Sequence, residues 1–140
     1  MGIEITTNIN AAPEVVWAVL TDVERWPEWS PSMTKVTRLD SGPFEEGSQT
    51  RIKQPRLRTM VWTVTEMTPG RSFVWEAKGP GLTLVAGHHL TNEEGGVVQV
   101  TLTVEQRGVV GRLLEPLTSR SAKRYVHMEA EGLKRQSEAG

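Results

Sequence analysis

The stretch Gly111–Ser137, GRLLEPLTSRSAKRYVHMEAEGLKRQS, decides the fold. It has the length of a long helix, and Pro116 falls within the first turns, where a proline is tolerated. We expect a helix from about Leu113 to Ser137. At about 100° per residue, apolar side chains gather on one half of this helix and basic side chains on the other. The stretch is therefore predicted to pack one face against the rest of the chain.

The centre of the apolar face is small and polar rather than bulky. The face comprises Leu114, Leu117, Thr118, Ser121, Ala122, Tyr125, Val126, Met128, Glu129, Gly132 and Leu133. Ser121, Gly132 and Tyr125 lie at its centre, with Glu129 beside them. Close packing against a sheet, with Gly132 allowing close approach, is one interpretation. The other is that the helix covers a cavity on the order of a few hundred Å³, in which case Gly132→Leu would fill the cavity and abolish binding.

Composition bounds the class of protein. The 140 residues suit one domain, 1–140, with a full core. A net charge of −1 gives no electrostatic footprint for nucleic acid, and the lack of cysteine excludes disulfides and thiolate metal sites. No segment approaches about 20 consecutive apolar residues, so stable membrane insertion is not expected. We expect a cytoplasmic location, and a monomer or a homodimer.

Alternation and turn residues predict the remaining elements. Apolar residues alternate with polar ones from Ile3 to Ile9, as in a half-buried strand. Pro13 opens a helix, and a second short helix carries Trp26 and Trp29. Six further strands are predicted around 33–39, 47–54, 58–66, 73–77, 82–90 and 98–105. This order predicts an α+β fold, with an antiparallel sheet of six or seven strands covered by helices on one face.

The segment APEVVWAVLTD, residues 12–22, followed by WPEW at 26–29, resembles the START-like (SRPBCC) superfamily. Within it, the chain is similar to the polyketide cyclase/dehydrase-like proteins, and the order of elements supports this along the whole chain. The resemblance implies a helix-grip fold, in which a curved antiparallel sheet wraps around the C-terminal helix. It also implies an apolar cavity between sheet and helix. The superfamily includes lipid and hormone carriers and polyketide aromatase/cyclases, and its members share no single catalytic motif.

Candidate site residues lie on the apolar faces of several predicted elements. The predicted ligand-binding set is Trp62, Phe73, Trp75, Leu84, Ala86, His88, Ser121, Tyr125, Met128 and Gly132. We expect His88, Trp75 and Tyr125 to project toward one space. The catalytic candidates are His88, Tyr125 and Glu129, since each can exchange a proton or a hydrogen bond. A hydrogen-bonded core role is the alternative for His88 and Tyr125, and solvent exposure for Glu129.

Other polar residues have less specific surroundings. Glu66 continues the face of Met60, Trp62 and Val64, and as a carboxylate near the end of a strand it can also simply reach solvent. Arg51 and Lys53 share one strand face and could pair with a ligand carboxylate or remain solvated. The three histidines lack metal-ligand spacing, and no G-x-S-x-G motif occurs. No metal and no cofactor are therefore expected.

Three functions remain open from the sequence. The first is binding of a small hydrophobic molecule, such as a lipid, a polyketide or an aromatic metabolite, by removal of apolar surface from water. The second is a polyketide cyclase, aromatase or dehydratase without a cofactor, in which one acid/base enolises a flexible chain held in the cavity. The third is a protein-interaction module with a filled core. In a carrier, Tyr125→Phe would weaken polar ligands and spare apolar ones.

Overall fold

The computed structural model describes the backbone of residues 2–139 and the side chains of 2–110 and 120–139. The elements are β1 (Gly2–Ile9), α1 (Pro13–Thr21), the 3₁₀ helix η1 (Val23–Glu28), β2 (Lys35–Arg38), β3 (Gln49–Lys53), β4 (Met60–Thr68), β5 (Ser72–Gly79), β6 (Leu82–Asn92), the 3₁₀ turn η2 (Glu94–Gly96), β7 (Val98–Arg107) and α2 (Val109–Ala139). The described residues thus confirm the predicted order of one strand, two short helices, six strands and a long helix.

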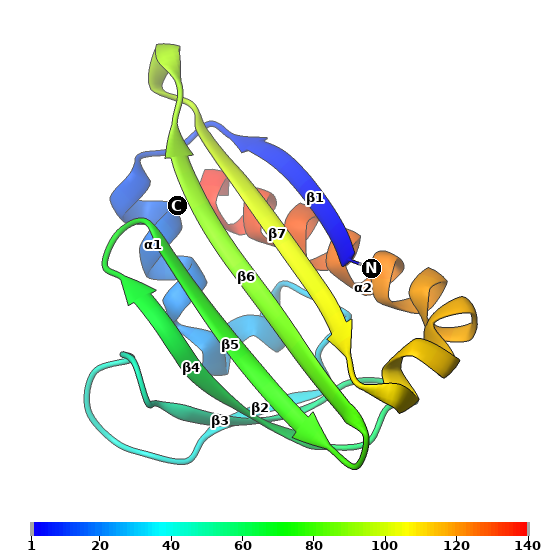
Figure 1. Ribbon diagram of the computed structural model, residues 1–140. Helices are drawn as coiled ribbons and strands as arrows, with labels where there is room; N and C mark the ends of the chain where they lie inside the picture. Colours follow the sequence, from blue (N-terminus) through cyan, green and yellow to red (C-terminus); the bar gives the residue numbers. More distant parts are fainter. Residues whose placement is uncertain (1, 140) are drawn as a thin grey trace.

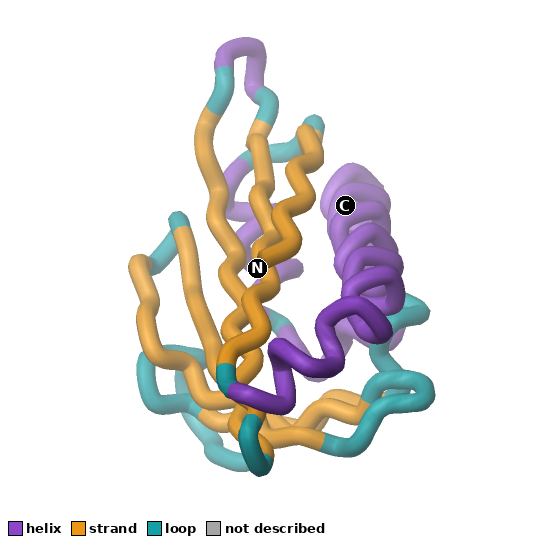
Figure 2. Tube along the Cα trace, turned by 45° about the vertical axis from the view of Figure 1, so that its right-hand side comes forward, coloured by secondary structure: helices purple, strands orange, loops and turns teal. Residues whose placement is uncertain are grey.

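Seven strands form one antiparallel sheet in the order β1-β7-β6-β5-β4-β3-β2. Consecutive strands from β2 to β7 are neighbours, as short turns between strands require. The exception is β1, which crosses to the far edge and pairs with β7, so that Ile5 lies opposite Leu102. Figures 1 and 2 show the sheet curving around α2. This is the helix-grip arrangement that the resemblance implies.

Helix α2 is longer than predicted at both ends. Gly108 has φ +96 and turns the chain into the helix, and a Cβ there would lie 2.5 Å from the Gly81 carbonyl oxygen. The Val110 N–H donates to that same carbonyl at 2.9 Å, which ties the helix start to the β5–β6 turn. Pro116 lies inside the helix. The predicted face residues Leu114, Leu117 and Thr118 fall outside the described side chains.

The far end of α2 is fixed to the end of β1 through Glu138. Its carboxylate accepts hydrogen bonds from the Lys134 ammonium and from the Asn10 N–H, both at 2.8 Å. The bond from Lys134 first, and that from Asn10 second, lower the pKa of Glu138 below its ordinary value. These contacts hold the exposed C-terminal turn of the helix beside the sheet edge.

The buried side of α2 is rotated relative to the predicted face. Val126, Ala130 and Leu133 are buried in the core, although Ala130 lies outside the predicted face, whereas Met128, which belongs to that face, is partly exposed. The helix packs mainly on β1 and β7. Because β1 and β7 hold one side of the helix, its next face is turned toward β4, β5 and β6.

A β-bulge corrects the predicted facing of Glu66. The β4–β5 register shifts between Val64 and Glu66, which adds one residue to β4. An extra residue reverses the side on which all later side chains lie. Glu66 is therefore exposed, and Met67 packs against the core in its place.

The segment α1–η1 closes one end of the space between sheet and helix. Trp26 and Trp29 are both buried, and the Trp26 indole N–H donates to the Leu20 carbonyl at 3.0 Å. The Trp26 ring lies 5.4 Å from that of Trp75 on β5, measured between centroids. Aromatic contacts of this kind stabilise a packed end wall. The open space lies beyond this wall, beside the middle of α2.

Candidate functional site

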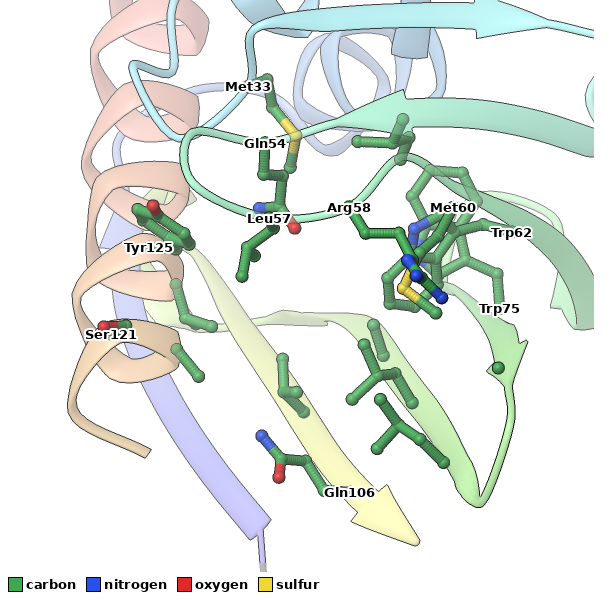
Figure 3. A pocket seen from close by; sticks show the side chains of 18 of the residues that line it. Met33, Gln54, Leu57, Arg58, Met60, Trp62, Trp75, Gln106, Ser121 and Tyr125 are labelled. Atoms are coloured by element: carbon green, nitrogen blue, oxygen red, sulfur yellow. The ribbon is translucent and has the colours of Figure 1, made fainter. Parts of the chain in front are cut away.

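A cavity of about 500 Å³ lies between the sheet and α2. Its walls come from the concave faces of β4 to β7, from the middle of α2 and from the loop between β3 and β4 (Figure 3). This volume falls in the range of small-molecule sites. Most of its lining is aliphatic or aromatic, with a few polar side chains among the apolar ones. The geometry suits an apolar molecule that carries a small number of polar groups.

Seven of the ten residues predicted to bind ligand line this cavity. They are Trp62, Trp75, Leu84, Ala86, His88, Ser121 and Tyr125. Alternation places the five strand residues on the concave face, and helical spacing places Ser121 and Tyr125 one turn apart on α2. His88, Trp75 and Tyr125 therefore border one space, as expected. Their part in binding a ligand remains a prediction.

Three predicted lining residues lie elsewhere. Phe73 is fully buried behind His88, with the two rings stacked at a centroid distance of 4.0 Å. Met128 is partly exposed on α2 and is not among the residues that line the cavity. Gly132 is buried against the backbone of Trp29, where an added Cβ would lie 2.1 Å from the carbonyl oxygen. The expectation that Gly132→Leu fills the cavity is therefore wrong, because that side chain would strike Trp29.

Tyr125 connects the helix to the β3–β4 loop. Its hydroxyl donates a hydrogen bond of 2.6 Å to the Pro55 carbonyl, across 70 positions of sequence. The hydroxyl proton is thus already engaged, so a ligand would meet this oxygen only as an acceptor. Tyr125 positions one wall of the cavity as well as lining it.

Tyr125→Phe is expected to loosen the β3–β4 loop while leaving the fold intact. Loss of this one hydrogen bond should lower the free energy of unfolding by about 1 kcal/mol. Amide hydrogen exchange should report the change at Leu57, whose N–H donates to Gln54 within the loop at 3.1 Å. Unchanged exchange at Leu57 in the variant would contradict a positioning role for Tyr125.

His88 and Glu129 form a buried polar pair in the cavity wall. The His88 side chain is 3% exposed and that of Glu129 is 12% exposed, and His88 Nε2 lies 3.4 Å from Glu129 Oε1. On its other side, His88 Nδ1 lies 3.2 Å from the Phe73 carbonyl oxygen. A carbonyl can only accept, so Nδ1 carries the hydrogen of this bond. The Nε2 atom then faces the Glu129 carboxylate.

The Glu129 carboxylate keeps an unused acceptor. Although Oε1 is within ion-pair distance of His88, the contact does not have hydrogen-bond geometry, and no described group donates to Oε1. A buried acceptor without a donor is costly, so such atoms in native proteins call for a partner. A hydroxyl or enol on a bound molecule would supply that donor. Of the catalytic candidates, the structure thus brings His88 and Glu129 together, whereas Tyr125 bonds elsewhere.

Several lining residues were not predicted from the sequence. Gln54, Arg56, Leu57 and Arg58 come from the β3–β4 loop, and Gln106 comes from β7. The loop has no periodicity from which the direction of a side chain can be read. Its signal was compositional: two arginines flank a leucine directly after Pro55.

The strand residues Arg51 and Lys53 do not line the cavity. Arg51 is exposed on β3, and the Lys53 ammonium donates to the Gln54 and Leu57 carbonyls. They border a smaller recess together with Thr34 and Lys35. Lys53 therefore supports the loop rather than facing a ligand.

Within the described residues, no cluster of three or more His, Asp or Glu side chains is arranged to hold a metal ion. None of the described helices combines the length and apolar character needed to span a membrane.

The chain is similar in sequence to one described protein family. Residues 2–138 match the family described as polyketide cyclase / dehydrase and lipid transport. No curated protein matches the sequence.

Solved structures share the fold at low sequence identity. Hypothetical protein jhp0584 from Helicobacter pylori is 12% identical, with a TM-score of 0.81 over 97% of this chain and 86% of its own. The Zhui aromatase/cyclase from Streptomyces sp. R1128 is 18% identical, with a TM-score of 0.75 over 99% and 93%. A START superfamily protein from Mycobacterium smegmatis is 13% identical, with a TM-score of 0.71 over 99% and 94%. At these identities, the likeness establishes the fold alone.

Proposed function

Since this chain belongs to the polyketide cyclase / dehydrase and lipid transport family, we propose that it binds one small hydrophobic molecule between the sheet and α2. The observation that carries the proposal is the cavity of about 500 Å³ with a mainly apolar lining. A lipid, a polyketide or an aromatic metabolite would fit this chemistry. A protein-interaction module with a filled core does not account for such a space.

Desolvation supplies the affinity in this proposal. Each Å² of apolar surface removed from water contributes about 25 cal/mol, against which the ligand loses its free motion. Trp62, Trp75 and Leu84 offer flat and branched apolar surface on the sheet side. The polar pair His88 and Glu129 then orients the ligand, because a molecule that leaves Glu129 Oε1 without a donor binds less well.

A second function, cyclisation or dehydration of a polyketide, is favoured by the same polar pair. His88 and Glu129 stand in an apolar wall, with Nε2 3.4 Å from Oε1. A group of this kind can take a proton from the carbon beside a ligand carbonyl and return one to an oxygen. The cavity would contribute by holding the flexible chain in a folded conformation. No cofactor enters this chemistry.

Glu129→Gln and His88→Ala separate the two functions. Gln keeps the size of Glu129 and removes its ability to exchange a proton, and Ala removes the imidazole. A carrier should keep its affinity for a candidate polyketide within about tenfold in both variants, since the apolar walls are unchanged. A cyclase should lose turnover by about 10²- to 10⁴-fold.

Affinity and turnover are measured on the same preparations, with wild type and His89→Ala as references, because His89 is exposed on the same strand. Turnover that survives in both site variants would remove the pair from catalysis. If the wild type binds the polyketide without converting it, the carrier function is the one that remains.

A further inference from the structure

The cavity opens at a mouth that carries two arginines. Five lining residues are exposed to solvent, and we call them the mouth: Arg56, Leu57, Arg58, Pro80 and Ser121. Figure 3 shows Arg58 directed from the β3–β4 loop over the same cavity that Met60 and Trp62 line. A ligand that enters the cavity therefore passes or remains beside cationic groups.

The loop that presents these arginines is held in a specific conformation. Arg56 has φ +63, in the left-handed region that a residue with a side chain seldom adopts. Such backbone persists where the surroundings fix it, and it gathers at ligand sites. Lys53 donates to the carbonyls of Gln54 and Leu57, and Tyr125 donates to that of Pro55. Hydrogen bonds on both sides of Arg56 thus order the mouth.

The charge of the mouth is not balanced by the cavity wall. Among the described lining residues, Glu129 is the sole carboxylate, and its neighbour is His88. Neither Arg56 nor Arg58 has an ion pair or a hydrogen bond within the described part of the chain. Two guanidinium groups beside an apolar space, with no ion-pair partner among the described residues, fit a ligand that carries an anionic group of its own.

We propose that the ligand is an amphipathic acid, with its apolar body in the cavity and its anionic oxygen group at the mouth beside Arg56 and Arg58. This inference rests on the proposed hydrophobic-ligand function and narrows its ligand class. A guanidinium group matches carboxylate and phosphate oxygens through paired N–H donors. The anion remains at the solvent-exposed mouth, so the ligand gains the apolar contacts without the cost of burying a charge.

The test compares three probes with one alkyl chain: dodecanoate, dodecyl phosphate and the neutral dodecanol. Each displaces Nile red, a neutral dye, from the wild type, the double variant Arg56→Gln/Arg58→Gln and the control Arg71→Gln. Arg71 is exposed in the β4–β5 turn, at the opposite end of β5 from the mouth residue Pro80. The control therefore removes one positive charge far from the cavity.

Wild type and control should bind both anionic probes about 3- to 10-fold more tightly than dodecanol at low salt, a modest factor because the arginines are exposed. The double variant should lose this preference while its affinity for dodecanol stays within about twofold of that of the wild type. Added salt should shrink the preference in the wild type. A preference for carboxylate alone or for phosphate alone identifies the head group.

Equal wild-type affinity for the acids and for dodecanol overturns this inference and leaves hydrophobic binding standing. A double variant with equally reduced affinity for all three probes also overturns it, because the loop would then only close the cavity. A double variant that keeps its preference for the acids but loses binding to anionic vesicles would assign the arginines to a membrane surface instead. If the wild type binds neither Nile red nor any probe, the proposed function fails as well.

Discussion

Gly132→Ala should destabilise the protein by about 2–3 kcal/mol, although alanine is the better helix former. Helix propensity alone would favour alanine by about 1 kcal/mol. Steric overlap opposes this gain, because the added Cβ would lie 2.1 Å from the Trp29 carbonyl oxygen and 2.8 Å from an atom of the Trp29 ring. The nearest atom belongs to the backbone, which cannot turn aside as the end of a flexible side chain does. We expect the overlap to dominate.

Urea unfolding of wild type and Gly132→Ala measures this difference. Glu131→Ala is the matched control, since it changes the preceding, exposed residue of the same helix and should stay within about 0.5 kcal/mol of wild type. A Gly132→Ala protein as stable as wild type, or more stable, would show that α2 and the η1 segment do not approach as closely as described.

Ala86→Phe should lower affinity for a hydrophobic ligand by at least about 100-fold, because its ring would occupy the volume that a ligand needs. Ala86 lies in the middle of the concave face, opposite Trp75 on one neighbouring strand and Val104 on the other. All three residues line the cavity. Filling an existing space adds contacts instead of forcing atoms apart, so stability should stay within about 1 kcal/mol of wild type or rise.

Dye binding and thermal unfolding together check this prediction. Val85→Phe is the control, because the adjacent residue points to the opposite face of β6 and adds a ring outside the cavity. It should bind the dye as wild type does. Full dye binding by a folded Ala86→Phe variant would place the ligand elsewhere on the molecule.

The fold could be predicted because its signals are periodic. Alternation identified β1 and β7, and the helical repeat identified α2, since one face of each must be buried. The same reasoning brought Trp75, Ala86, His88 and Tyr125 to one space. Periodicity could not predict the bulge in β4, because one inserted residue leaves no trace in the pattern. The bulge reverses the side of the strand on which Glu66 lies, so the predicted facing of Glu66 was wrong.

The remaining features of the site depend on contacts between distant residues. The role of Gly132 is set by Trp29, more than 100 positions away, so the sequence around Gly132 could not distinguish a cavity from close packing. Phe73 has the correct strand face, but it lies behind His88 rather than before it. The arginines of the β3–β4 loop have no periodic neighbours, so the direction of their side chains could not be predicted. Only the three-dimensional arrangement of the loop and α2 places them at the mouth.

Quenching of tryptophan fluorescence by ω-bromododecanoate tests the central claim most directly, because bromine quenches an indole only on contact. Trp26, Trp62 and Trp75 line the cavity. Titration of the wild type should give saturable quenching that fits one site, and the same titration of Ala86→Phe should give none beyond that of free indole. Equal quenching of both proteins, or quenching of the wild type that never saturates, would contradict a ligand site between the sheet and α2.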